Sequence, residues 1–293
     1  MRARTVRPAL VLAIWIACAA VLHAADAVKP HVLLINDDGI DAPGIAALVD
    51  ALAPAYRITV AAPAVEQSGV SQATTYRTPV LVEQRPGREG VRRWAVHAQP
   101  ATCARLALTA LIAQDPPLVV LSGINRGANT GDSVWGSGTL GGAREAGLAG
   151  FPAIALSADH PRGAEPDWPA AGRWARAVLD QLLAAHLPAR GRVVKVEIPF
   201  PAGTARGVRI TGCGLTHPIE DGYVEKAGPA DAEGRLFQAR WVPASDDLPG
   251  TDTQELASGW VTVTPISLDQ TDYRGLAALA AIAWTAPAPS AAP

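Results

Sequence analysis

A short aliphatic run that ends in two aspartates is the feature that most constrains this chain. The segment His31–Ile35 reads His-Val-Leu-Leu-Ile and is followed at once by Asn-Asp-Asp-Gly, whose carboxylates are Asp37 and Asp38. An unbroken apolar run suits a strand that is covered on both faces, as in a parallel sheet. Pro43 and Gly44 then precede apolar residues at helical spacing. The sequence therefore predicts a buried strand, a tight acidic turn and a helix.

This arrangement places the two aspartates at the carboxyl edge of a parallel sheet, where open α/β sheets bind ligands. Neighbouring carboxylates repel one another unless a cation lies between them or one of them stays protonated. An Asp-Asp-Gly surface turn is the simpler interpretation of such a tripeptide. The strand before it and the helix after it favour a divalent-metal site.

Strands and helices alternate along the following part of the chain. This alternation predicts an α/β fold built on a doubly wound parallel sheet. Right-handed crossovers place the strand ends on one edge, so Ser68 and Asn125 should lie near Asp37 and Asp38. The expected strands are Tyr56–Pro63, Leu118–Leu121, Phe151–Ser157 and Arg192–Ile198, with Val91–His97 as an antiparallel excursion. The expected helices are Thr102–Ile112, one beginning near Thr139, Trp168–Leu187 and Arg274–Ala283.

The two ends of the chain differ in composition from the middle. Three arginines, the apolar stretch Ala9–Leu22 and a run of small residues predict a secretory signal peptide at residues 1–27, with an apolar part too short for a stable membrane anchor. We therefore expect export to the periplasm. Residues 28–285 should form one domain, with a core at 28–198 and a β-rich appendage with a closing helix at 199–285. The Ala/Pro/Ser-rich tail 286–293 is expected to be disordered.

Charge and cysteine content exclude some classes of protein. The formal net charge is −2, which does not favour binding to a nucleic-acid duplex. Beyond the predicted signal peptide only Cys103 and Cys213 remain. Two cysteines are not a disulfide framework, although they could pair in an oxidising compartment if they lie close together.

Short oxygen-bearing side chains gather at the predicted strand ends. The carboxylates of Asp37 and Asp38, the hydroxyl of Ser68 and the amide of Asn125 are hard ligands, suited to Mg²⁺, Mn²⁺ or Ca²⁺. Serine and asparagine are also common turn formers. Their expected meeting on one sheet edge supports the interpretation as a metal site.

The segment Ser137-Gly138-Thr139 opens a predicted helix. Free N–H groups, the helix dipole and two hydroxyls make such a terminus a natural phosphate site, although a plain N-cap gives the same pattern. Residues 136–141 also match a dinucleotide-binding fingerprint, with Asp159 downstream. The glycines do not directly follow their strand, which argues against that assignment. A metal beside a phosphate site instead indicates phosphoester hydrolysis.

Several motifs together resemble the SurE family. They are Asn36-Asp-Asp-Gly39, Ser122-Gly-Ile-Asn125-x-Gly127-x-Asn129, Ser137-Gly-Thr139, Gly250-Thr-Asp252 and Gly259–Pro265. The resemblance implies a metal-dependent nucleotidase acting on nucleoside 5′- and 3′-monophosphates. It also implies a Rossmann-like core and a C-terminal arm that is swapped in homodimers or homotetramers.

The same resemblance assigns roles to individual residues. It implies that Asp37, Asp38, Ser68 and Asn125 hold a divalent ion, for which we expect Mg²⁺ or Mn²⁺. Our own interpretation adds that one of the two aspartates, which the sequence does not distinguish, orients the attacking water as base. Asn129, Ser137, Gly138 and Thr139 would line the phosphate pocket.

Two departures from the family pattern leave questions open. The stretch His97–Cys103 differs from the usual Gly-Thr-Pro-x-Asp-Cys, which leaves the substrate preference open. A signal peptide is unusual in a family generally thought cytoplasmic, so a cytoplasmic location is the alternative to export. The alternative functions are an exopolyphosphatase or another phosphomonoester hydrolase, and a non-catalytic exported protein that binds nucleotides or phosphate.

Overall fold

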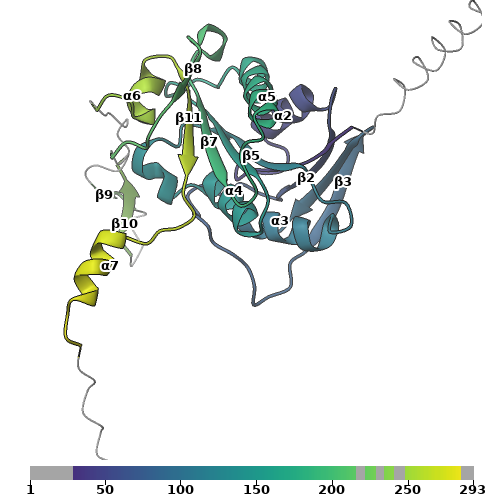
Figure 1. The fold of residues 1–293 in the computed structure, drawn as a ribbon. Helices are drawn as coiled ribbons and strands as arrows, with labels where there is room; N and C mark the ends of the chain where they lie inside the picture. The colour runs from purple at the N-terminus through teal and green to yellow at the C-terminus, as the bar shows by residue number, and fades with distance from the viewer. Residues whose placement is uncertain (1–28, 216–221, 229–233, 241–247, 285–293) are drawn as a thin grey trace, which may run out of the picture.

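The computed structural model describes residues 29–215, 222–228, 234–240 and 248–284. Its described part is built on one nine-stranded sheet in the order β3-β4-β2-β1-β5-β6-β7-β11-β8 (Figure 1). The bounds of these strands are β1 His31–Ile35, β2 Arg57–Pro63, β3 Val82–Arg88, β4 Val91–Val96, β5 Val119–Arg126, β6 Ala153–Ala158, β7 Val193–Ile198, β8 Val208–Ile210 and β11 Val261–Ile266.

Strand β1 lies at the centre of the fold and is buried along its whole length. It pairs in parallel with β2 on one side and with β5 on the other, and β6 and β7 continue the parallel pairing beyond β5. The predicted doubly wound parallel sheet is therefore confirmed. Because successive strands are added on opposite sides of β1, the strand order reverses between β1 and β5. Such a switch point opens a crevice at the carboxyl ends of the strands.

Helices cover both faces of the sheet. On one face lie α2 (Pro43–Leu52) and α5 (Trp168–Ala184), and on the other lie α3 (Pro100–Leu106) and α4 (Gly138–Leu148) (Figure 1). Helix α2 buries apolar residues at helical spacing and begins with a proline, which suits a helix start. A Cβ atom on Gly44 would lie 1.9 Å from the carbonyl oxygen of Ile124, so α2 packs directly on the end of β5.

Several elements differ from their predicted bounds. Strand β3 was not predicted, because Pro86 and Gly87 interrupt its apolar pattern. Strand β4 pairs antiparallel with β3, as expected of an excursion, but in parallel with β2. The helix expected at Thr102–Ile112 divides into α3 and a π-helical turn at Ala107–Leu111. Strand β5 continues to Arg126, so Asn125 lies at the end of the strand rather than in the following loop.

The C-terminal part is divided between the main sheet and a separate hairpin. Strand β11 pairs antiparallel with β7 and in parallel with β8, so these strands of the expected appendage extend the core sheet. The strands β9 (Tyr223–Lys226) and β10 (Leu236–Ala239) form their own antiparallel pair. The helices α6 (Asp252–Ala257) and α7 (Tyr273–Ala280) follow, and α7 projects away from the sheet (Figure 1).

Some predictions concern the ends of the chain and the cysteines. The predicted signal peptide and the tail 286–293 lie outside the described residues. Of the helices in the described part of the chain, none combines the length and apolarity that a membrane span needs. Cys103 and Cys213 are both free thiols.

Candidate metal and phosphate site

The carboxyl ends of β1 and β5 bring the predicted acidic and amide residues to one edge of the sheet. Ile35 of β1 is paired with Ser122 of the parallel strand β5. Asp37 and Asn125 come two and three residues after this pair, so both lie at the carboxyl ends of their strands. The backbone N–H of Gln67 donates to the carbonyl oxygen of Asp37 at 2.7 Å. This bond holds the loop that carries the exposed Ser68 at the same edge.

Asp37 is buried between the end of β1 and the first turn of α4. Only 3% of its surface is exposed, and its Oδ1 accepts a 2.6 Å hydrogen bond from the hydroxyl of Thr139. A Cβ atom on Gly138 would lie 2.9 Å from the Oδ2 of Asp37. A residue without a side chain at position 138 is therefore needed for this close approach.

Asp38 follows Asp37 at this edge of the sheet, which we call the rim, and is half-buried. Its Oδ2 accepts a 3.0 Å hydrogen bond from the backbone N–H of Arg126, at the end of β5. Glu66 and Glu165 face it across the rim, while the side chain of Arg126 forms an ion pair with Glu165. The rim therefore carries an excess of negative charge around Asp38.

Burial makes both carboxylates easier to protonate than they would be in water. It raises the pKa of Asp37 to about 6, against a smaller opposing effect of the Thr139 hydroxyl and with a further upward effect of the Asp38 charge. Burial also raises the pKa of Asp38, and the nearby Glu66 and Glu165 add to this shift. A bound cation would offset the cost of keeping both groups charged at neutral pH.

The donor set at this edge fits a hard divalent cation. Asp37 Oδ2 and Asp38 Oδ1 lie outside the side-chain hydrogen bonds described above, and the Nδ2 of Asn125 donates to the Gly127 carbonyl at 2.7 Å, which fixes its amide plane. Beside Asp37, the buried Asn36 Oδ1 has no hydrogen-bond partner. Among the residues that the structure describes, no three His, Cys, Asp or Glu side chains gather into a metal-binding group. A cation here would therefore need neutral oxygens beside the two carboxylates, as the predicted set supplies.

The first turn of α4 lies against Asp37 at the same edge of the sheet. Ser137 is its N-cap, and the Ser137 Oγ accepts a hydrogen bond from the N–H of Leu140 at 3.1 Å. The N–H groups of Gly138 and Thr139 precede the first intrahelical hydrogen bonds and point out of the helix. The hydroxyl of Thr139 donates to Asp37, and its backbone N–H also hydrogen-bonds that carboxylate. The backbone N–H of Gly138 therefore remains as a donor for a phosphate.

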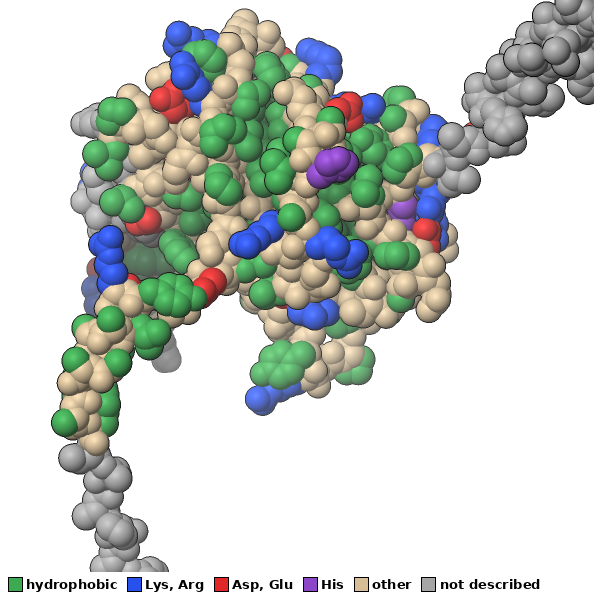
Figure 2. Space-filling view, viewed as in Figure 1, with side chains coloured by type: hydrophobic (Ala, Val, Ile, Leu, Met, Phe, Trp, Pro, Cys, Tyr) green, Lys and Arg blue, Asp and Glu red, His purple; other side chains and the backbone are tan. Residues whose placement is uncertain are grey.

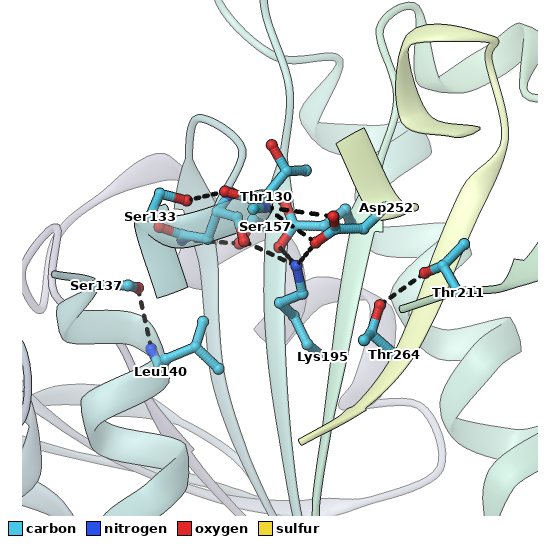
Figure 3. A network of polar contacts seen from close by, with 12 residues as sticks. Thr130, Ser133, Ser137, Leu140, Ser157, Lys195, Thr211, Asp252 and Thr264 are labelled. Carbon is cyan, nitrogen blue, oxygen red and sulfur yellow. Dashed lines mark hydrogen bonds and ion pairs between the residues drawn. The ribbon is translucent and has the colours of Figure 1, made fainter. Parts of the chain in front are cut away.

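Asn129 is buried, like the other predicted phosphate-binding residues. Its Nδ2 donates to the hydroxyl of Ser157 at 3.0 Å, and only 8% of the residue is exposed. An amide group carries two N–H donors, so one remains for a ligand. The backbone of Asn129 bonds the buried Glu197 and Lys195, and Lys195 in turn forms an ion pair with Asp252. Figure 3 shows Lys195 and Asp252 beside Ser157 in this network.

Sequence reasoning missed this network and the contacts between the predicted site residues. Lys195 and Glu197 lie inside a strand that is predicted from its apolar residues alone. Asp252 contributes to the sequence analysis only as part of the Gly250-Thr-Asp252 motif. A signal was present, because two opposite charges two residues apart in a buried strand point to the same face.

The fold and these residues define an α/β protein with an acidic, oxygen-rich site beside a helix N-terminus. The family model described as survival protein SurE matches residues 32–220. The chain is 36% identical over 244 residues to the 5′-nucleotidase SurE of Desulfatibacillum aliphaticivorans, covering 83% of this chain and 94% of that protein. It is 38% identical over 253 residues to the 5′-nucleotidase SurE 1 of Burkholderia lata, covering 85% and 95%.

A solved structure agrees with these sequence matches. The crystal structure of the SurE protein from Aquifex aeolicus superposes with a TM-score of 0.71 at 28% identity, covering 85% of this chain and 98% of that one. The chain belongs to the SurE family, as the motifs predicted, and the Rossmann-like fold is confirmed.

The raised pKa of Asp37 predicts a pH-dependent stability that the Asp37→Asn variant lacks. In metal-free protein this carboxyl has a pKa of about 6 when folded, against 3.8 as its ordinary value, so the folded state binds the extra proton between these two pH values. The unfolding free energy of the wild type, relative to the variant, should therefore fall by on the order of 2 kcal/mol as the pH rises from about 4 to about 7. Denaturant titrations in chelator measure this difference.

Addition of Mg²⁺ or Mn²⁺ at about pH 7 should raise the unfolding free energy of the wild type again, because the cation stabilises the charged carboxylate. The unfolding free energy of the variant should stay unchanged. An unfolding free-energy difference that stays constant over this pH range would contradict the account of Asp37.

Proposed function

We propose that this protein is a divalent-metal-dependent phosphomonoesterase that hydrolyses nucleoside 5′- and 3′-monophosphates to nucleoside and phosphate. The observation that carries the proposal is the contact of Asp37, the neighbour of Asp38, with the N-terminus of α4 at the switch point of the sheet. The relatives named as 5′-nucleotidases support it, because the chain matches them over most of their length.

In this proposal the metal ligands are Asp37, Asp38, Ser68 and Asn125. The geometry supports the carboxylates most directly, since the backbone of Arg126 and the hydroxyl of Thr139 hold their other oxygens in place. A bound Mg²⁺ or Mn²⁺ would supply charge neutralisation at the phosphoryl oxygens. One of the two aspartates would also orient the attacking water.

The phosphate group would be held by the first turn of α4 and by Asn129. Gly138 would donate through its N–H group, aided by the helix dipole, while Ser137 would use its hydroxyl hydrogen. Thr139 would line the pocket while its own hydroxyl and N–H hold Asp37. Because Thr139 bonds Asp37 and is adjacent to Gly138, the metal site and the phosphate site would share one rigid turn.

The aspartate pair favours a hydrolase over a non-catalytic phosphate-binding protein. Two carboxylates beside a phosphate pocket weaken phosphate binding in the absence of a cation, so a plain receptor would do better without them. An exopolyphosphatase would use the same catalytic edge. Phosphate release from a panel of nucleoside monophosphates, other phosphomonoesters and polyphosphate separates these substrate classes.

The Asp38→Asn variant is expected to lose nearly all phosphate release from nucleoside monophosphates while its thermal unfolding stays close to that of the wild type. The substitution removes a charge that would bind the cation but keeps the shape of the side chain. A suitable control is Asp50→Asn, because Asp50 forms an exposed ion pair with Arg88 away from the edge. Retained turnover of Asp38→Asn with metal present, or full wild-type turnover in chelator, would refute the assignment.

We further propose that the protein forms a homodimer or homotetramer through its C-terminal arm. Helix α7 has no buried residue, and Figure 2 shows hydrophobic side chains along it. The exposed apolar residues of this segment are Tyr273, Leu276, Leu279, Ile282 and Trp284. An exposed apolar helix of this kind is typical of an interface between subunits.

The double substitution Leu276→Ser and Leu279→Ser is expected to shift the protein towards monomers in light-scattering measurements, because it removes apolar area from that interface. Leu148→Ser, which changes a similarly exposed leucine at the end of α4, should leave the oligomeric state unchanged. A wild-type protein that is monomeric at micromolar concentration would contradict the proposal.

Residues 1–27 support a proposal that the protein is exported, with nucleotides outside the cytoplasm as its substrates. Fractionation of expressing cells should recover a periplasmic protein whose N-terminus lies near residue 28. Recovery of the uncleaved chain from the cytosol would show that the protein acts there, as is usual for the family.

A further inference from the structure

We propose that the buried ion pair between Lys195 and Asp252 is a positioning device that holds the Asn129–Gly131 segment in place and thereby couples the C-terminal part of the chain to the phosphate pocket. Its two partners come from separate elements. Lys195 lies in the middle of β7, and Asp252 is the first residue of α6. Neither residue has any exposed surface.

The ion pair is bonded directly to the backbone of the segment. The Nζ of Lys195 contacts Asp252 Oδ2 and also donates to the carbonyl oxygen of Asn129 at 2.9 Å. The N–H of Gly131 lies 3.3 Å from both carboxylate oxygens of Asp252. The two charged groups therefore hold the segment at both of its ends (Figure 3).

Other buried groups fix Asn129 between these two points. Its N–H donates to Glu197 Oε2 at 2.9 Å, and its side-chain Nδ2 donates to the hydroxyl of Ser157 at 3.0 Å. Backbone donor, backbone acceptor and side chain of Asn129 are thus all engaged. The amide plane, and with it the N–H available to a phosphate, has one orientation.

The same carboxylate holds the C-terminal part of the chain. Asp252 Oδ1 accepts hydrogen bonds from the N–H groups of Gly214 and Thr253, both at 2.8 Å. Gly214 follows β8, and Thr253 opens α6. One side chain therefore joins β8 and α6 to the segment that begins the 3₁₀ turn Gly131–Trp135, which leads directly to Ser137 of the phosphate pocket.

Stability alone does not account for such a network. Removing charged groups from water is costly, and well-packed apolar residues often stabilise a core as well as a buried ion pair does. What charged and directional groups add is a defined geometry. Here the geometry is that of Asn129 and of the turn leading to the helix N-terminus.

The variant Asp252→Asn tests this inference. An amide can still accept from Gly214 and Thr253 through its oxygen, but its NH₂ group would face the Lys195 ammonium, so the link to Lys195 is lost. Hydrogen exchange of the Asn129 and Gly131 amides should become faster by roughly tenfold or more. The KM for a nucleoside monophosphate should rise several-fold with a smaller change in kcat, because a group that binds the phosphate throughout the reaction is displaced.

Thr264→Val is the matched control. Thr264 is opposite Lys195 in the β7–β11 pairing, and its buried hydroxyl bonds that of Thr211 at 2.7 Å (Figure 3). This variant loses a buried hydrogen bond in the same region without touching Asn129, so it should lower the melting temperature and leave both KM and the exchange of the segment unchanged. If Asp252→Asn does not fold, Ser157→Ala, which removes the acceptor of Asn129 Nδ2, should still raise KM and leave kcat near the wild-type value.

The kinetic part of this inference rests on the proposed function, whereas the exchange measurement does not. A wild-type protein that hydrolyses no phosphomonoester would refute the proposed function but leave the exchange result decisive for the positioning role. Unchanged exchange and unchanged KM in folded Asp252→Asn would overturn the inference. An equal rise of KM in Thr264→Val would also overturn it, because it would show a general effect of lost stability.

Discussion

The structure depends on a single electrostatic constraint, a buried carboxylate next to a half-buried one at the edge of a parallel sheet. Asp37 is almost fully enclosed, and its pKa is raised to about 6 by that burial. Without hydrogen-bond donors or a cation, two such carboxylates would favour protonation of one of them or a turn that is more open to water. The surrounding chain instead holds both groups: Thr139 donates to Asp37, and the backbone of Arg126 donates to Asp38. This arrangement is the basis of the proposal that a cation binds here.

The packing of α4 follows from the same constraint. Its first turn approaches Asp37 so closely that position 138 has no room for a side chain. This approach places the N-terminus of a helix, the positive end of its dipole, beside Asp37. In the proposed function, a cation and a phosphate bind here as neighbours, an arrangement that needs both the end of β1 and the first turn of α4. The Lys195–Asp252 ion pair connects α6 to Asn129, which is far from α6 in the sequence, because Lys195 also bonds the carbonyl oxygen of Asn129.

Much of the fold could be predicted from the sequence because it depends on local patterns. The strands β1, β5, β6 and β7 are apolar runs that a reader of the sequence recognises without the structure, and the acidic turn after β1 was found in the same way. Strand β3 could not be found, since its residues lack that pattern. The pairing of β11 with β7 joins two segments that are far apart in the sequence and depends on tertiary packing, so no local sequence pattern predicts it.

The candidate site was predictable as a set of residues but not as a geometry. Spacing and strand ends suggested which side chains would meet, whereas the bond from Thr139 to Asp37 and the engagement of Asn129 by Ser157 join residues far apart in the sequence. Asp252 is the clearest case, because its partners Gly131, Lys195 and Gly214 come from three different segments. Hydrogen bonds between distant segments depend on packing that the sequence pattern does not encode.

The most direct test of the account is the anomalous scattering of a crystal soaked in Mn²⁺. The account predicts one strong peak between the Asp37 and Asp38 carboxylates, within about 2.3 Å of an oxygen from each and close to Asn125. Water alone in that gap at saturating Mn²⁺, or the two carboxylates turned away from Asn125, would contradict it.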